Sequence, residues 1–245
     1  MRKFIVIALL IGVVGYVTVV LAQMTQRIQI GMELTNSAVA YSRVKPDSSV
    51  RMLVLGDSTA LGVGVSGSKY SIAGRFGEEF PEMAIGNISE SGMRLADLAE
   101  QIVLLDMGRH YEVLLIQIGG NDILRFTNRK DLRQDLREIL QFSETVADSV
   151  FILHSGNMGL APFFPWPAGP VLTDRTRVVR QIFLEEARQY AGVYYVDLFT
   201  EVEEDPFAED YEKYYAEDLL HLSDEGYGVW YKKIRETMDN AGFTP

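Results

Sequence analysis

Five short apolar runs along the chain predict buried β-strands. They cover residues 50–55, 83–88, 111–118, 150–154 and 193–198. Each run is short and almost continuously apolar, which is typical of strands covered on both faces, as in a parallel sheet. Gly56, Gly119 and Gly156 follow closely after three of them and mark the expected strand ends.

The segments between these runs carry apolar residues at mixed three- and four-residue spacings, which predicts helices. The expected helices cover residues 71–80, 95–105, 131–147 and 173–190, and a last one is capped by Ser223 and ends near Met238. Because strand and helix alternate, we predict an α/β fold, a three-layer α/β/α sandwich with a mainly parallel five-stranded sheet and right-handed crossovers.

The first 22 residues have a different pattern, because residues 4–22 carry no charge and follow Arg2 and Lys3. A helix of this length spans roughly 28 Å, close to the ~30 Å hydrocarbon core of a bilayer. The run lacks a polar face, which disfavours a buried core helix. Its small-residue end at Ala22 also fits a signal peptide, but the run exceeds the usual signal core of about 7–15 residues. We therefore expect residues 1–22 to be an uncleaved membrane anchor, with a cleaved signal as the alternative.

Either alternative exports the remainder of the chain, since the two basic residues favour a cytoplasmic N-terminus. The expected location is thus membrane-anchored with the folded part outside the cytoplasm, periplasmic or extracellular, or secreted after cleavage. Residues 23–49 are predicted to form a stalk or linker, because a mildly amphipathic stretch runs into the loop signal Pro46-Asp47-Ser48-Ser49. The folded domain is expected to cover residues 50–245.

Composition narrows the chemistry that this domain can perform. The chain has 245 residues of which 47% are hydrophobic, enough for the core of one α/β domain. It has no cysteine, which excludes disulfides, thiol catalysis and cysteine-bound metals. Its three histidines are too few and too scattered for a convincing metal site. The net charge of −11 argues against a nucleic-acid partner.

Candidate reactive residues follow the strands at the edge where ligands bind in open parallel sheets, beyond the carboxyl ends. Ser58 follows the first strand, Gly92 the second and Asn121 the third. Asp218 and His221 follow the fifth. These positions are therefore expected to meet at one edge of the sheet.

Ser58 is the candidate nucleophile. Gly56 permits a tight turn after the first strand, and a hydroxyl in such a turn becomes a nucleophile when a base takes its proton. The alternative is that Asp57 and Ser58 only cap a helix. The Gly-Asp-Ser tripeptide is a weak signal by itself, so the other residues have to decide.

His221 is the candidate base. His110 precedes the third strand and is expected at the opposite edge of the sheet, and His154 has no carboxylate close to it in sequence. Asp218 lies three residues before His221, and a carboxylate there would fix the tautomer of the ring and stabilise its protonated form. An ordinary polar loop before a capped helix is the alternative.

Asn121 and Gly92 are the candidate donors to an oxyanion. Gly119 and Gly120 let the backbone turn sharply before Asn121, whose side-chain amide can donate a hydrogen bond. Gly92 would contribute its backbone N–H to the same anion. The alternative for Asn121 is a local turn residue.

In the segments that contain these candidate residues, the chain resembles the SGNH hydrolases, also called GDSL esterases and lipases. Four blocks of that family occur here in order: Gly56-Asp57-Ser58, Asn87-Ile88-Ser89-Glu90-Ser91-Gly92-Met93-Arg94, Gly119-Gly120-Asn121-Asp122 and Asp218-Leu219-Leu220-His221. Together they cover nearly the whole domain. The resemblance implies a flavodoxin-like three-layer fold and requires no metal or other cofactor.

The resemblance also implies a role for each matching residue. Ser58 would be the nucleophile, His221 its base and Asp218 the partner of the base. The N–H groups of Ser58 and Gly92 and the amide of Asn121 would form the oxyanion hole. Further matching positions would support the site without reacting, namely Asp57, Asn87 and Asp122. A mild departure follows Ser58, where Thr59-Ala60-Leu61-Gly62 replaces the more usual aliphatic or aromatic residue and small residue.

An apolar loop after the fourth strand is the expected place for substrate. Phe163, Phe164 and Trp166 lie in it among four prolines between residues 160 and 170. Such a loop suits a substrate pocket or a membrane-facing lip, and equally suits packing onto the domain. A second stretch, residues 207–215, is expected to be a surface loop that borders the site.

The leading hypothesis is a membrane-tethered or exported serine esterase. Its substrate would be a carboxylic ester of a lipid, a short acyl chain or a carbohydrate, and its partner the membrane through residues 4–22. An O-acyltransferase that uses a glycan hydroxyl in place of water is the alternative within enzymes. A catalytically silent binding domain is the alternative from another class.

Overall fold

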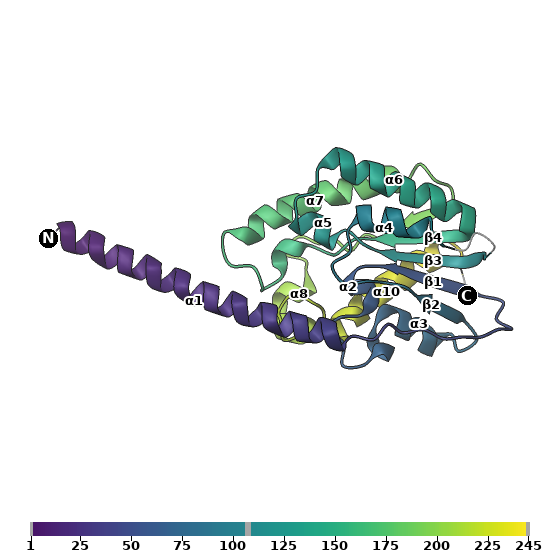
Figure 1. Ribbon diagram of the computed structural model, residues 1–245, viewed down its shortest axis with the longest axis horizontal. Helices are drawn as coiled ribbons and strands as arrows, with labels where there is room; N and C mark the ends of the chain where they lie inside the picture. The colour runs from purple at the N-terminus through teal and green to yellow at the C-terminus, as the bar shows by residue number, and fades with distance from the viewer. Residues whose placement is uncertain (1, 106–108, 244–245) are drawn as a thin grey trace.

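The computed structural model describes residues 2–105 and 109–243. Residue 1, which begins the predicted anchor, and residues 106–108, 244 and 245, which belong to the predicted domain, lie outside the described residues. The described part is a sheet covered by helices on both faces, from which one long helix projects (Figure 1).

The sheet has five strands that are all parallel, in the order β2-β1-β3-β4-β5. The strands are β1 (Arg51–Gly56), β2 (Ala84–Asn87), β3 (Tyr111–Gln117), β4 (Ala147–Leu153) and β5 (Val193–Tyr195). The predicted parallel five-stranded sheet is therefore confirmed. The order of the strands reverses at β1, because β2 is added on one side of it and β3 on the other, and open parallel sheets bind ligands at the carboxyl ends of the strands at such a point.

Helices cover both faces of the sheet. One face is packed by α3 (Ile72–Glu79) and α10 (Asp224–Asn240), and the other by α4 (Leu95–Ile102), α6 (Arg129–Val146) and α7 (Ala168–Ala187). Side chains alternate along β1. Met52 and Val54 pack in the core under α3 and α10, while Leu53 and Leu55 pack in the core under α4, α6 and α7. The predicted three-layer sandwich is confirmed.

Short helical turns complete the domain. They are α2 (Ser58–Leu61), α5 (Gly120–Leu124), α8 (Pro206–Glu209), α9 (Tyr211–Tyr214) and the 3₁₀ turns at Ser68–Tyr70 and Met158–Leu160. The turns α2 and α5 follow the carboxyl ends of β1 and β3, and they carry Ser58, Asn121 and Asp122 among the candidate site residues.

Some element bounds differ from the predicted ones. Strand β4 begins at Ala147, directly after α6, because the helix closes with the Ala147 N–H on the Ser143 carbonyl and the chain then enters the sheet. Helix α7 begins at Ala168, five residues before the predicted start at Thr173. Pro170 falls in its first turn, where a missing N–H costs no intrahelical hydrogen bond.

Helix α1 (Arg2–Ser37) is a single element of 36 residues. By length and composition it is able to cross a membrane, a property that signal sequences share. It continues past the predicted end of the anchor and through the first part of the predicted stalk. Further along that stalk, Arg43 pairs with Ile85 at the edge of β2, with N–O distances of 2.7 and 2.9 Å. The chain therefore packs on the domain several residues before the expected start at residue 50.

Candidate active site

The turn that carries Ser58 requires glycine at position 56. Gly56 has φ of 139°, and a Cβ there would lie 1.8 Å from the Gln117 carbonyl oxygen of the neighbouring strand. Asp57 then caps α2, since its Oδ1 accepts from the Thr59 N–H at 2.9 Å and from the Thr59 hydroxyl at 2.8 Å. Ser58 is thus held as the first residue of α2, directly beyond the carboxyl end of β1.

His221 and Asp218 meet Ser58 from the other side of the site. The His221 Nε2 lies 3.1 Å from the Ser58 Oγ, and the Nδ1 lies 2.5 Å from the Asp218 Oδ2. The other carboxylate oxygen, Oδ1, accepts from the N–H groups of Leu220 and His221, both at 3.0 Å. One oxygen of Asp218 therefore fixes the loop and the other holds the ring.

The carboxylate sets the direction of the hydrogen bonds. Burial works to raise the pKa of Asp218, but the hydrogen bond and charge of His221 and the two backbone N–H groups outweigh it, so the pKa lies below its usual value. An ionised carboxylate only accepts, so the Nδ1 of His221 carries the hydrogen. The Nε2 then accepts from the Ser58 hydroxyl, which is the arrangement that a general base requires.

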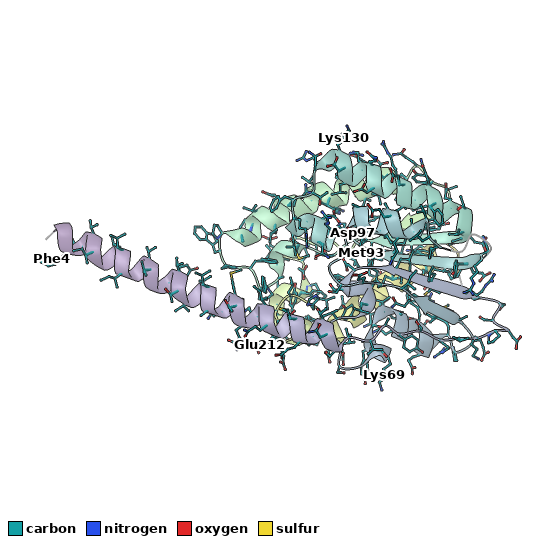
Figure 2. The ribbon with its side chains drawn as sticks, in the orientation of Figure 1. Phe4, Lys69, Met93, Asp97, Lys130 and Glu212 are labelled. Carbon is teal, nitrogen blue, oxygen red and sulfur yellow. The ribbon has the colours of Figure 1, made fainter. Side chains whose placement is uncertain are left out.

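Gly92 and Asn121 line the same cavity as Ser58 and His221. Gly92 adopts φ of 83°, and a Cβ there would meet open space. The Asn121 Nδ2 donates to the Met93 carbonyl at 3.1 Å, which fixes the amide and uses one of its two hydrogens. Met93 itself lies just before α4 and is labelled in Figure 2. The second amide hydrogen remains to serve an anion in the cavity.

Three carboxylate and amide side chains fasten the loops of the site. The Asn87 Nδ2 donates to the Ala60 carbonyl at 2.9 Å, which ties the second loop to α2. Asp122 accepts from the Leu95 N–H at 3.0 Å and from the Thr127 hydroxyl at 2.8 Å. Burial raises the pKa of Asp122, and it raises that of Asp57, against the opposing bonds from Thr59, to about 6. The structure thus brings together all of the motif residues expected at this edge.

The other two histidines lie away from the cavity. His110 is exposed, with its Nε2 2.7 Å from the Asp148 Oδ1 at the opposite edge of the sheet. His154 is buried, its Nδ1 contacts the Ser155 carbonyl, and burial lowers its pKa to about 4. Neither of them lines the cavity. Among residues 2–105 and 109–243, no three His, Asp or Glu side chains are grouped in a way that would hold a metal ion.

The cavity beside Ser58 has a volume of about 620 Å³. Its apolar lining comes from several elements: Met158, Ala161, Phe207, Leu220, Leu222, Val229 and Trp230. Charged side chains of α10 also line it, namely Lys232, Lys233 and Glu236. A volume and lining of this kind suit the apolar part of a small substrate.

Phe163, Phe164 and Trp166, the expected pocket residues, are not among those that line this cavity. Phe163 is buried and packs edge-to-face on Phe164, while its backbone N–H donates to the Leu219 carbonyl at 3.0 Å. Trp166 points outward and is 79% exposed. Only earlier residues of the same segment reach the cavity, and Ala161 is one of them.

Sequence reasoning missed residues from two other parts of the chain. Phe207 and Tyr215, in the stretch expected to be a surface loop, are buried and line the cavity. The density of aromatic residues in that stretch was the available signal. Gly31 of α1 lies against Asp218. The two residues are far apart in the chain, and no local sequence pattern predicts that they meet.

A sequence model of the GDSL-like Lipase/Acylhydrolase family matches residues 54–229, which is most of the chain. No curated protein matches the sequence significantly.

Solved structures share the fold at low sequence identity. A lipase from a goat rumen metagenome is 17% identical, with a TM-score of 0.57, and the match covers 77% of this chain and 97% of that one. The family 3 carbohydrate esterase of Clostridium thermocellum is 21% identical, with a TM-score of 0.56 and coverage of 78% and 96%. The acetylxylan esterase Axe2 of Geobacillus stearothermophilus is 19% identical, with a TM-score of 0.54 and coverage of 82% and 98%. At these identities the similarity shows the fold alone.

Proposed function

The chain belongs to the GDSL-like lipase/acylhydrolase family of ester-hydrolysing enzymes, and from this premise we propose that it is a serine esterase that works through an acyl-serine intermediate. One observation carries the proposal: the His221 Nε2 lies 3.1 Å from the Ser58 Oγ while its Nδ1 lies 2.5 Å from the Asp218 Oδ2. Nucleophile, base and orienting carboxylate in this order form the arrangement that activates a serine hydroxyl.

In the first half of the reaction, the Ser58 Oγ attacks the carbonyl carbon of the ester and His221 takes the hydroxyl proton. The carbonyl oxygen becomes an anion that accepts from the N–H groups of Ser58 and Gly92 and from the Asn121 amide. The bond from carbon to the alcohol oxygen then breaks. His221 gives its proton to the leaving alcohol, and the acyl group stays on Ser58.

In the second half, water replaces the alcohol. His221 takes a proton from the water as its oxygen attacks the acyl carbon, and the bond to the Ser58 Oγ breaks. His221 returns the proton to Ser58, and the carboxylic acid leaves. Asp218 stays ionised throughout and stabilises the protonated ring, which agrees with its lowered pKa.

The cavity supports a proposal for where the acyl group lies. Phe207, Leu220 and Trp230 contribute apolar surface to the space that Ser58 opens into. We place the acyl chain against these side chains rather than against Phe163, Phe164 and Trp166. A volume of about 620 Å³ accommodates acyl groups larger than acetyl.

We further propose that α1 anchors the enzyme with its domain outside the cytoplasm. The uncharged run 4–22 and the preceding Arg2 and Lys3 support this orientation. With residues 4–22 in the bilayer, Arg27 lies about 7.5 Å beyond it along the helix, since each helical residue adds ~1.5 Å. Arg27 contacts the domain, so the catalytic domain would lie next to the membrane surface.

Hydrolysis of p-nitrophenyl esters from acetyl to dodecanoyl by the full chain in detergent tests the proposal. Wild type should release p-nitrophenol, and Ser58→Ala should retain no more than about 10⁻³ of the rate, since only the oxyanion hole and binding remain. Full activity in Ser58→Ala would refute the serine mechanism. If an added sugar hydroxyl captures the acyl group in preference to water, the protein is the acyltransferase.

A further inference from the structure

The second half of α1 lies against the loop that carries Asp218 and His221. A Cβ built on Gly31 would lie 3.0 Å from the Asp218 Oδ2 and 3.7 Å from the Asp218 Cβ. Gly12 and Gly15 of the same helix have nothing within 4 Å of the corresponding position. The close approach of α1 to the domain is thus specific to its later turns, which run along the domain in Figure 1.

Arg27 makes a second contact on the same face of α1, one turn before Gly31. Its Nη1 donates to the Pro162 carbonyl at 2.7 Å and to the Phe163 carbonyl at 3.2 Å. Phe163 in turn donates its N–H to the Leu219 carbonyl at 3.0 Å. Leu219 directly follows Asp218, so both contacts of α1 lead to the same short loop.

This loop needs support from outside. Leu219 has φ of 59°, a left-handed conformation that is uncommon for a residue with a branched side chain and that persists where neighbours impose it. Asp218 is only 1% exposed although it is ionised, so its oxygens must be held by their partners alone. The oxygen that faces Gly31 is the one that holds the His221 Nδ1 at 2.5 Å.

We infer that α1 is a part of the active site, in which Gly31 and Arg27 position Asp218 and through it the base His221. The inference rests on the proposed serine mechanism. Helix α1 does not line the cavity, so it acts on the rate of the chemical steps and not on substrate binding. The segment that would tether the enzyme to a membrane then also determines the orientation of its catalytic base, His221.

Substitution of Gly31 tests this in the full chain, reconstituted in detergent micelles. Gly31→Ala places a methyl group 3.0 Å from the Asp218 Oδ2 and should lower kcat about 3- to 10-fold. Gly31→Val should lower kcat about 50-fold or more, with KM changed less than about twofold. Gly15→Val is the matched control, because it adds the same side chain to α1 in open space and should retain the wild-type kcat.

A double-mutant cycle separates positioning from general damage. In the Asp218→Asn background the carboxylate no longer holds the ring. Adding Gly31→Val to that background should therefore lower kcat by less than about twofold. An equal loss from Gly31→Val in both backgrounds would overturn the inference. So would a wild-type kcat in Gly31→Val beside an active wild type, whereas full activity in Ser58→Ala would refute the proposed function instead.

Discussion

The two halves of the catalytic apparatus are held in different ways. The Ser58 turn is fixed locally: Gly56 fits against the adjacent strand, and Asp57 caps the helix that Ser58 begins. The Asp218–His221 loop contains its own hydrogen bonds to Asp218, but the segments that pack against it come from far away in the sequence. These segments include Phe163 and Gly31.

This difference indicates which perturbations each half can withstand. Ser58 and Asn121 follow β1 and β3, two inner strands of the sheet, and should keep their geometry as long as the core is folded, while Gly92 follows the edge strand β2. The base and its carboxylate depend on a loop that α1 contacts from outside. A change in α1 should therefore affect general-base catalysis while it leaves the oxyanion hole and the cavity intact.

The largest effect is expected on the acid–base side. Asp218→Asn should lower kcat by about 10³–10⁴, because the ring loses the carboxylate that fixes its tautomer and stabilises its charge. Esterase kinetics of the purified full chain measure this. Asp148→Asn is a matched control, since it alters the other histidine–aspartate pair, at the opposite edge of the sheet. Its kcat should equal that of wild type, and a loss there as large as in Asp218→Asn would contradict the assignment.

On the nucleophile side, Asn121→Ala should lower kcat by about 10²–10³ through loss of one donor to the oxyanion. Steady-state kinetics on the best ester of the series give this value, with little change in KM. Asn128→Ala provides the control, because Asn128 caps α6 and its loss costs stability without touching the site. If the two variants lost equal activity, Asn121 would have a structural role only.

A smaller effect should come from Arg27, which tests whether the acid–base loop depends on α1. Arg27→Met keeps an unbranched apolar stem but loses the hydrogen bonds to the Pro162 and Phe163 carbonyls. We expect kcat to fall about 3- to 10-fold, the result of a small displacement of the Asp218 loop, with KM unchanged. Arg177→Met, which removes an exposed ion pair with Glu201, should leave kcat unchanged. A pure KM effect in Arg27→Met would instead place Arg27 in substrate binding.

The smallest effect concerns the stability of the Ser58 turn as a function of pH. Burial raises the pKa of Asp57 to about 6 from an ordinary value of 3.8, so the folded protein holds a proton there that the unfolded chain releases. This contribution to stability is complete below pH ~4 and is lost as pH rises through about 6. The rise in the Asp57 pKa from 3.8 to about 6 corresponds to a contribution of at most roughly 3 kcal/mol to the free energy of unfolding.

Asp57→Asn should remove that dependence, because the neutral amide oxygen still accepts from the Thr59 N–H. The melting temperature of the variant, relative to wild type, should therefore rise between pH 4 and pH 7. Parallel thermal unfolding of both proteins at the two pH values measures it. A difference in melting temperature that is equal at both values would contradict the raised pKa.

Much of the fold and of the site could be predicted from the sequence. The apolar runs gave the strands because buried parallel strands need side chains on both faces, and the polar motifs at their ends marked Ser58, Asn121 and His221. These signals are local. The same reasoning left Phe163 and Phe164 open between a substrate pocket and packing onto the domain, because an apolar loop has the same sequence pattern whether it turns toward a cavity or into the core; in the structure neither residue lines the cavity beside Ser58.

The features that could not be predicted from the sequence depend on contacts between distant segments. Gly31 and Asp218 are far apart in the chain, and a glycine in an apolar helix has many ordinary uses. Likewise Phe207 lines the cavity only because the chain before α8 folds back over the strand ends. Such contacts follow from tertiary packing, which a periodic pattern does not encode.

The most direct test of the account is covalent labelling of the full chain with an alkyl fluorophosphonate, followed by mass spectrometry of its peptides. Attack by an activated serine displaces fluoride and leaves a phosphonyl group on the oxygen. The account predicts one phosphonyl group per chain, carried by Ser58, with labelling abolished in Ser58→Ala and at least about 10²-fold slower in His221→Ala. Labelling of Ser58 at the same rate in wild type and His221→Ala, or no labelling of Ser58 in a protein that hydrolyses esters, would contradict it.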